Sequence, residues 1–295
     1  MEKLSSDPFG KETQGINYDI HRPHYPPHFI ERIKKSVNRK DNYIDIASGP
    51  GILFFPVFRE FQGETIIQDR SVKQLDVARE KLKEMKGVSK VSIIQSDAYE
   101  IIEHLPTPDL KFDLISIAQA YHWFEPYDFL DYVTKKLLKP DGTLAVAGYV
   151  REGFDYNYFS EDENFTKCCQ KHYEDYFSQI KPFYDIDRDR LVTCHSAVQF
   201  DKYFEVVERE TYDVTKELSL SELQKYLHTS SAYGRYVEKL KDTSTFVDPV
   251  NKMTKSIEEE LAEFSKRTKI QIKEKPIVMN LRFFLILCKN LKSIL

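Results

Sequence analysis

Between residues 42 and 150, short apolar segments alternate with segments of helical character, and this alternation constrains the fold most strongly. The apolar segments are 42–48, 64–69, 90–97, 111–120 and 143–150. One helical segment is 71–85, in which Leu75 and Leu82 lie on the same face. Strands that alternate with helices predict an α/β protein whose mainly parallel sheet is covered on both faces by right-handed crossovers.

The first apolar segment ends in a turn that contains Gly49 and Gly51, although the chain has only 10 glycines in 295 residues. Small residues there let a ligand approach the backbone closely. In open parallel sheets, ligands bind at the carboxyl ends of the strands. The third glycine of a dinucleotide-binding turn is replaced by Phe54, so the pattern disfavours a nicotinamide dehydrogenase. The turn therefore predicts a nucleotide-like ligand of another kind.

Acidic residues stand at the ends of the first three predicted strands, as Asp45, Asp69 and Asp97. A carboxylate at the end of the second strand can accept hydrogen bonds from both hydroxyls of a ribose. Asp97, followed by the small Ala98, suits an adenine. Each acid alone could be an ordinary cap or turn residue. Three of them at successive strand ends favour a nucleoside site.

Together these motifs resemble those of class I S-adenosylmethionine-dependent methyltransferases. The resemblance covers roughly residues 40–150 and includes "LLKPDGTLAV" (137–146). It implies a Rossmann-like fold, with a mainly parallel seven-stranded sheet and an antiparallel C-terminal hairpin, and S-adenosylmethionine as the cofactor. The cofactor contacts that it implies are Asp45, Ala47, Gly49, Gly51, Asp69, Arg70, Asp97, Ala98 and Gln119. Ala47 stands where the family most often has glycine.

Three further elements resemble a subgroup of methyltransferases similar to trans-aconitate methyltransferase. They are "YDIHRPHYP" (18–26), "AQAYHWFE" (118–125) and "YLHTSSAYGRY" (226–236). In the third element Ser230 stands where the subgroup commonly has tryptophan. The resemblance implies methyl transfer to a small molecule, with carboxylic acids as the acceptor class.

Methyl transfer is an in-line displacement, so the protein mainly has to align the reactants and exclude water. His122 follows the fourth strand and is the candidate catalytic residue. It could accept a proton from a hydroxyl or amine acceptor, or donate a hydrogen bond to an acid. It could also serve only to cap a turn or to pack beside Trp123.

The candidate substrate-binding residues are Tyr18, Arg22, Trp123 and Tyr233. Arg22 could bind a carboxylate with two parallel hydrogen bonds, or form a salt bridge that holds the N-terminal segment in place. Arg151 and Arg235 are further cations that could contact an anion. The rings of the other three residues could shield the ligands or simply pack in the core.

The chain changes character after residue 150, where polar and aromatic residues of helical pattern replace the strand–helix alternation. We expect an inserted helical cap over 151–200 that closes as a lid over the site. Residues 1–40 would form an N-terminal segment and helix over the cofactor, and 41–150 the cofactor-binding core. Residues 201–295 would complete the same domain with the remaining strands and helices.

Composition limits the other functions. The 43 basic and 47 acidic residues give a net charge of −4, which disfavours a nucleic-acid partner. No apolar run approaches the ~20 residues that span a bilayer, and we expect no membrane association. The N-terminus resembles neither a secretory signal nor a transit peptide, so a cytoplasmic location is expected. A small-molecule substrate is therefore favoured over RNA, while a protein substrate or protein partners stay open.

The cysteines are Cys168, Cys169, Cys194 and Cys288. No C-x-x-C spacing occurs among them, so they predict reduced thiols and no metal site. The main alternative to an enzyme is a catalytically inactive, methyltransferase-like subunit or scaffold of a larger assembly. Ala47 and Ser230, which depart from the family pattern, are compatible with that alternative.

Overall fold

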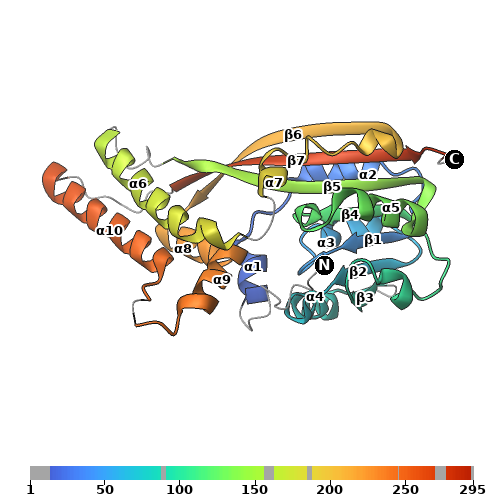
Figure 1. Cartoon of the computed structure of the whole chain (residues 1–295), viewed down its shortest axis with the longest axis horizontal. Coiled ribbons are helices and arrows are strands. Elements are labelled where there is room, and N and C mark those ends of the chain that lie inside the picture. Colours follow the sequence, from blue (N-terminus) through green and yellow to red (C-terminus); the bar gives the residue numbers. More distant parts are fainter. Residues whose placement is uncertain are drawn as a thin grey trace.

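The computed structural model describes residues 14–87, 91–155, 163–184, 188–244, 246–269 and 277–293. Within these ranges, seven strands form one sheet in the order β3-β2-β1-β4-β5-β7-β6 (Figure 1). They are β1 (Tyr43–Ile46), β2 (Thr65–Asp69), β3 (Val91–Gln95), β4 (Phe112–Ala118), β5 (Leu138–Asp155), β6 (Phe204–Leu218) and β7 (Ile277–Leu291). The strands from β3 to β5 pair in parallel, whereas β7 pairs antiparallel with both β5 and β6. The predicted fold class is confirmed.

Two apolar cores lie on the two faces of the sheet, because successive residues of a strand point to opposite sides. Tyr43 packs on the face covered by α2 (Pro27–Lys35), α3 (Phe54–Val57) and α4 (Val72–Glu84). Ile44 packs on the other face, with α5 (Pro126–Tyr132) and the π-helical turn η4 (Val133–Leu137). All four residues of β1 are buried between the two cores.

The helical segment directly after the glycine turn is short. It is split into α3 and the 3-10 turn η1 (Phe58–Glu60). Aromatic stacking holds this segment on the sheet: Phe54 lies 5.3 Å from Tyr43 and 5.1 Å from Phe58, between ring centroids. The short helix after the glycine turn is therefore held in place by the packing of its aromatic rings against the first strand.

The last three strands are long, and they extend beyond the parallel strands into a helical part (Figure 1). This part contains α6 (Glu163–Ile180), α8 (Leu220–His228), α9 (Ser231–Leu240) and α10 (Pro249–Thr268), with the turn η5 (Lys181–Phe183). Only α6, η5 and the short α7 (Arg188–Val192) come from the predicted cap. Helices from 201–295 lie beside them, so the helical part combines two regions that the sequence treats separately.

Helix α1 (Gln14–His21) lies between the helical part and the parallel strands (Figure 1). Lys81 of α4 forms an ion pair with Asp19 and donates a hydrogen bond to the carbonyl of Pro50, 3.1 Å away. The N-terminal helix is thereby placed next to the glycine turn.

Three short 3-10 turns complete the described elements, η2 (Ile101–His104), η3 (Tyr121–Trp123) and η6 (Phe200–Lys202). Parts of the predicted N-terminal segment and cap, residues 1–13, 156–162 and 185–187, lie outside the described residues. Among the described helices, none combines the length and the apolar character needed to cross a bilayer.

Candidate functional site

The turn after β1 is built from left-handed backbone. Ala47 has a φ of 51°, Gly49 of 59° and Gly51 of 79°. A Cβ atom on Gly51 would lie 2.6 Å from the ring of Phe55, so a side chain there would collide. Ala47 carries a side chain in a conformation that glycine adopts more easily.

Asp69, at the end of β2, is bonded to this turn. Its carboxylate accepts hydrogen bonds from the backbone N–H of Gly49 and of Ser71, both at 2.8 Å. Asp97, after β3, is exposed and accepts a hydrogen bond from the N–H of Tyr99 at 3.0 Å. The strands β3, β2 and β1 are neighbours in the sheet and run parallel. The predicted residues at their carboxyl ends therefore lie next to one another, at the same end of the three strands.

The other two cofactor candidates beyond these strand ends differ in exposure. Arg70 is exposed next to Asp69, and Ala98 is buried next to Asp97.

Asp45 is fully buried at the end of β1. The hydroxyl of Ser48 donates to one carboxylate oxygen at 2.6 Å, and the hydroxyl of Ser116 donates to the other. Burial raises the pKa of Asp45 to about 7, although these two hydrogen bonds act in the opposite direction. Both carboxylate oxygens of Asp45 are thereby bonded to serine hydroxyls, one of them from the turn itself.

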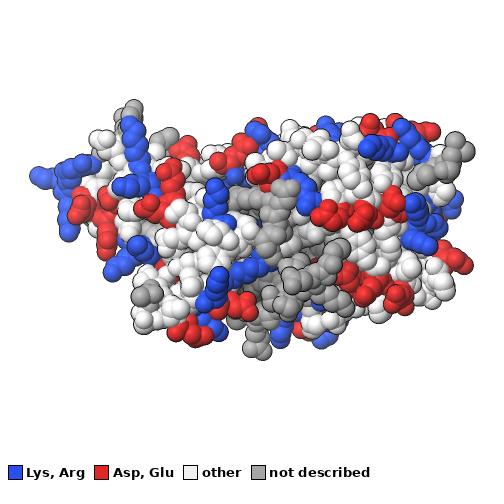
Figure 2. Space-filling view, in the orientation of Figure 1, with Lys and Arg blue, Asp and Glu red and all other residues white. Residues whose placement is uncertain are grey.

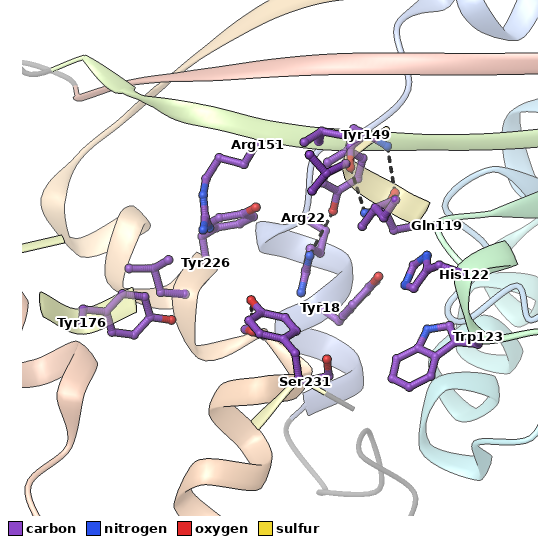
Figure 3. A pocket seen from close by; sticks show the side chains of 16 residues that line it. Tyr18, Arg22, Gln119, His122, Trp123, Tyr149, Arg151, Tyr176, Tyr226 and Ser231 are labelled. Atoms are coloured by element: carbon purple, nitrogen blue, oxygen red, sulfur yellow. Dashed lines mark hydrogen bonds between the residues drawn. The ribbon is translucent and has the colours of Figure 1, made fainter. Parts of the chain in front are cut away.

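A pocket opens next to α1, beyond the end of β4, with a cavity volume of about 110 Å³. Six residues singled out from the sequence line it: Tyr18, Arg22, Gln119, His122, Trp123 and Arg151. Figure 3 shows Tyr18 and Arg22 between His122 and Trp123 on one side and Arg151, Tyr176 and Tyr226 on the other. The N-terminal element and the segment after β4 are thus brought together.

Tyr233 does not line this pocket. Its hydroxyl donates a hydrogen bond to Asp248 at 2.5 Å, and its ring packs on His228. We therefore leave Tyr233 out of the acceptor site, because its polar group is already engaged in joining α9 to the start of α10.

Gln119 directly follows β4 and has left-handed backbone, with a φ of 57°. Its side-chain amide donates to the carbonyl of Tyr149 at 3.0 Å, and its side-chain oxygen accepts from the N–H of Tyr149 at 2.8 Å. This pair of bonds ties the end of β4 to β5. The residues that follow Gln119 then turn toward the pocket.

His122 lies in the 3-10 turn η3 and is buried. Its Nδ1 atom has no hydrogen-bond partner within the described structure. Burial, together with the neighbouring His195 and Arg190, lowers the pKa of His122 to about 3. The imidazole is therefore neutral at physiological pH and has an unused hydrogen-bonding atom.

Two arginines contribute positive charge to the pocket. Arg22 donates to the hydroxyl of Tyr149 at 3.2 Å and to the carbonyl of Thr229 at 2.9 Å, and its buried Nε has no partner. Arg151 donates to the hydroxyl of Tyr173. Among the described residues, no carboxylate forms an ion pair with either guanidinium. The salt bridge considered for Arg22 is replaced by neutral partners.

Aromatic rings stack on these cations. The guanidinium carbon of Arg22 lies 4.7 Å from the ring centre of Tyr18 and 5.4 Å from that of Tyr226. The same Tyr226 ring lies 5.9 Å from the guanidinium of Arg151. Both arginines are therefore gathered around one tyrosine at the pocket.

Sequence reasoning missed most of the tyrosines of the pocket. These are Tyr149, Tyr176, Tyr184 and Tyr226. Tyr149 and Arg151 are two residues apart on β5, so a strand extended past residue 150 would have placed both on one face. The other tyrosines come from α6, α8 and the segment after η5, whose folding together no local pattern shows.

Comparisons with known proteins agree with this architecture. A family model described as a methyltransferase domain matches residues 38–216. An uncharacterized methyltransferase from Schizosaccharomyces pombe is 29% identical over 143 residues, which are 48% of this chain and 53% of that protein. A ubiquinone/menaquinone biosynthesis C-methyltransferase from Francisella tularensis is 32% identical over 115 residues, which are 38% of this chain and 44% of that protein.

The chain spans about half the length of the curated relatives it matches. A solved structure, a putative type II methyltransferase from Anaeromyxobacter dehalogenans, superimposes with a TM-score of 0.63. It shares 15% sequence identity, and the match covers 92% of this chain and 99% of that one, which shows a common fold. Because the family model covers more than half of the sequence, the chain belongs to the methyltransferase domain family.

Proposed function

We propose that this protein is an S-adenosylmethionine-dependent methyltransferase whose acceptor is a small anionic molecule, with a carboxylate as the methylated group. The observation that carries the proposal is the pair Arg22 and Arg151, which face one pocket without acidic partners in the described structure. This is the acceptor class of the trans-aconitate methyltransferase-like subgroup that the sequence resembles.

The residues at the strand ends fit the proposed cofactor. The glycine turn is free of side chains at Gly49 and Gly51, so a ligand can approach its backbone. Asp69 lies beside that turn, where a carboxylate can accept hydrogen bonds from a ribose. When bound there, S-adenosylmethionine would supply an activated methyl group on a positively charged sulfur.

The arginines fit a negatively charged acceptor. Guanidinium groups bind carboxylates through paired, charge-assisted hydrogen bonds. A buried donor that lacks a partner costs free energy, which an acceptor oxygen at Arg22 Nε would recover. The stacked rings of Tyr18 and Tyr226 hold the cation in place and keep water from it.

The neutral charge of His122 also favours a carboxylate as the methyl acceptor. A hydroxyl or amine must lose a proton during methylation and needs a base whose pKa is near the working pH. His122, with a pKa lowered to about 3, is a weak base. A carboxylate has no proton to lose, and neutral His122 can donate a hydrogen bond that orients it.

The surface agrees with a small-molecule acceptor more than with a nucleic acid. Figure 2 shows basic and acidic residues interspersed over both the helical end and the sheet end of the visible face. A nucleic-acid partner generally requires a continuous basic surface. The net charge of −4 points the same way.

The test is transfer of a labelled methyl group from S-adenosylmethionine to a panel of small acids, phenols and amines. We expect acids to be methylated, and Arg151→Gln to raise their KM by about tenfold or more, since a charged hydrogen bond contributes about 1.5–3 kcal/mol. Arg59→Gln removes an exposed arginine that does not line the pocket and should change nothing. Turnover of phenols or amines alone would overturn the acceptor assignment.

The catalytically inactive alternative is compatible with Ser230 and with Ala47, whose methyl group occupies left-handed backbone in the turn. Calorimetry with S-adenosylmethionine and with its demethylated product separates the two functions. Binding of either, weakened by Asp69→Ala, supports the enzyme. Absence of heat with both ligands would favour a scaffold that has lost its cofactor.

A further inference from the structure

A cysteine, a histidine and a glutamate meet between α6 and α10, in the helical part away from the parallel strands (Figure 1). Cys168 and His172 lie one turn apart on α6, and Glu260 approaches them from α10. The Sγ of Cys168 lies 3.0 Å from Oε1 of Glu260 and 3.8 Å from Nε2 of His172. The His172 and Glu260 atoms are 3.6 Å apart. Three donor atoms of three chemical types therefore converge.

These separations suit a single tetrahedral metal ion. Zinc bonds of about 2.3 Å to sulfur and about 2.0 Å to nitrogen and oxygen give donor–donor distances of about 3.3–3.6 Å. One observed distance, 3.0 Å, is below that range, one, 3.6 Å, is at its upper limit, and one, 3.8 Å, is above it, so small side-chain adjustments would close the site. His172 and Glu260 have side chains that are 24% and 35% exposed, which lets an ion enter from solvent.

We propose that Cys168, His172 and Glu260 bind one Zn²⁺ ion, with water as the fourth ligand. Thiolate, imidazole and carboxylate are all ligands that zinc accepts, and this mixed set suits zinc better than magnesium or calcium. The thiolate and the carboxylate together balance the two charges of the ion. The thiol proton, which Cys168 now donates to Glu260, leaves to solvent when the Zn–S bond forms.

The ion would join two helices that are distant in sequence. Phe165 contacts Phe264 at 5.3 Å between ring centroids, on the side of the site toward the start of α6, so the helices run antiparallel. Coordination would add a link between the predicted lid and the region that follows it. Zinc binding to the folded chain would then raise its thermal stability.

The test is a titration of the metal-free full chain with Co²⁺, which reports its ligands by absorption. We expect one ion per chain, with bands from thiolate-to-cobalt charge transfer and from tetrahedral coordination, both displaced by Zn²⁺. Cys168→Ser should remove the charge-transfer band. His172→Gln and Glu260→Gln should each weaken binding by about tenfold or more, because even outer partners of metal ligands contribute about 10–100-fold.

Two matched variants control for non-specific binding. Cys194→Ser removes a thiol that lies just after α7, outside the proposed site. Glu259→Gln removes the exposed acid next to Glu260. Both should bind like the parent, and circular dichroism checks that every variant is folded. Zn²⁺ should raise the melting temperature of the parent and controls but not of Cys168→Ser. Equal affinity in Cys168→Ser and the parent, or no charge-transfer band in the folded parent, would overturn the proposal.

Discussion

At the scale of single residues, Ala47 carries a conformational cost at the centre of the proposed cofactor turn. Its φ of 51° lies in the left-handed region, which costs an ordinary residue roughly 1–2 kcal/mol. We expect Ala47→Gly to raise the free energy of unfolding by about 1 kcal/mol, because glycine's greater freedom in the unfolded chain offsets part of the gain. Urea unfolding measures this difference.

A second alanine serves as the matched control for that prediction. Ala78 is buried in α4, where right-handed helical backbone favours alanine. Ala78→Gly should lower the free energy of unfolding by about 1 kcal/mol or more. If both substitutions destabilise alike, the turn does not hold Ala47 in the left-handed region.

His122 predicts a dependence of stability on pH. Its folded-state pKa is lowered to about 3, mainly by burial, whereas in the unfolded chain it is about 6.5. Below about pH 6.5 the unfolded chain takes up a proton that the folded chain refuses, so stability falls as the pH falls. Between about pH 7.5 and about pH 5 the loss is roughly 2 kcal/mol.

The comparison of the parent with His122→Gln isolates this effect. Asp45 acts in the opposite direction: its pKa, raised to about 7, adds stability at low pH that is lost as the pH rises through about 7. Both proteins carry Asp45, so their difference reports His122 alone. We expect urea unfolding to show a smaller loss toward pH 5 in the variant, and parallel pH profiles would mean that His122 is not held neutral.

At the scale of elements, two serines that precede helices have different roles. Ser219 forms a reciprocal capping box with Glu222 at the start of α8, since its hydroxyl accepts the N–H of Glu222 at 3.2 Å. Ser71 precedes α4, but its hydroxyl is buried without a partner in the described structure. Ser219→Ala should therefore cost about 1 kcal/mol of stability, and Ser71→Ala should cost little or nothing. Equal losses in denaturant unfolding would contradict this distinction.

How far the sequence predicts the elements depends on how local their signals are. Strands β1 to β4 could be placed because each is a short apolar run that ends at a polar or glycine turn. The length of β5 could not, because its continuation past Val150 depends on pairing with β7, some 130 residues later. The length of β5 is therefore set by contacts between segments that are distant in sequence.

The residues of the candidate site also divide into those with a local sequence signal and those placed by tertiary contacts. Gly49, Asp69 and His122 follow strands, so their position at the sheet edge follows from the strand–helix alternation. Tyr226 comes from a helix whose docking is set by tertiary contacts, and it could not be assigned. In the proposed zinc site, the spacing of Cys168 and His172 is a local helical signal, but Glu260 is not within reach of any sequence pattern.

At the scale of the whole molecule, Arg22 links three parts of the structure. It follows α1, donates to Tyr149 of β5, and donates to the carbonyl of Thr229 at the end of α8. These hydrogen bonds join the helical part to the sheet at the pocket. A substrate anion at Arg22 would bind where the two parts meet, so its binding and their relative motion would be coupled.

Hydrogen exchange can test this link. In Arg22→Ala we expect the amides of α1 and α8 to exchange roughly tenfold faster, because charged hydrogen bonds contribute about 1.5–3 kcal/mol and the site is partly open to solvent. The amides of β1 and β2 should keep their protection, since these strands pair with each other and with β3 and β4, and the hydrogen bonds of Arg22 go to Tyr149 and Thr229 instead. Arg59→Gln, on the surface, should leave both sets unchanged. Faster exchange in β1 and β2 as well would indicate a general loss of stability, and unchanged exchange in α8 would mean that the rest of the interface holds the helical part without Arg22.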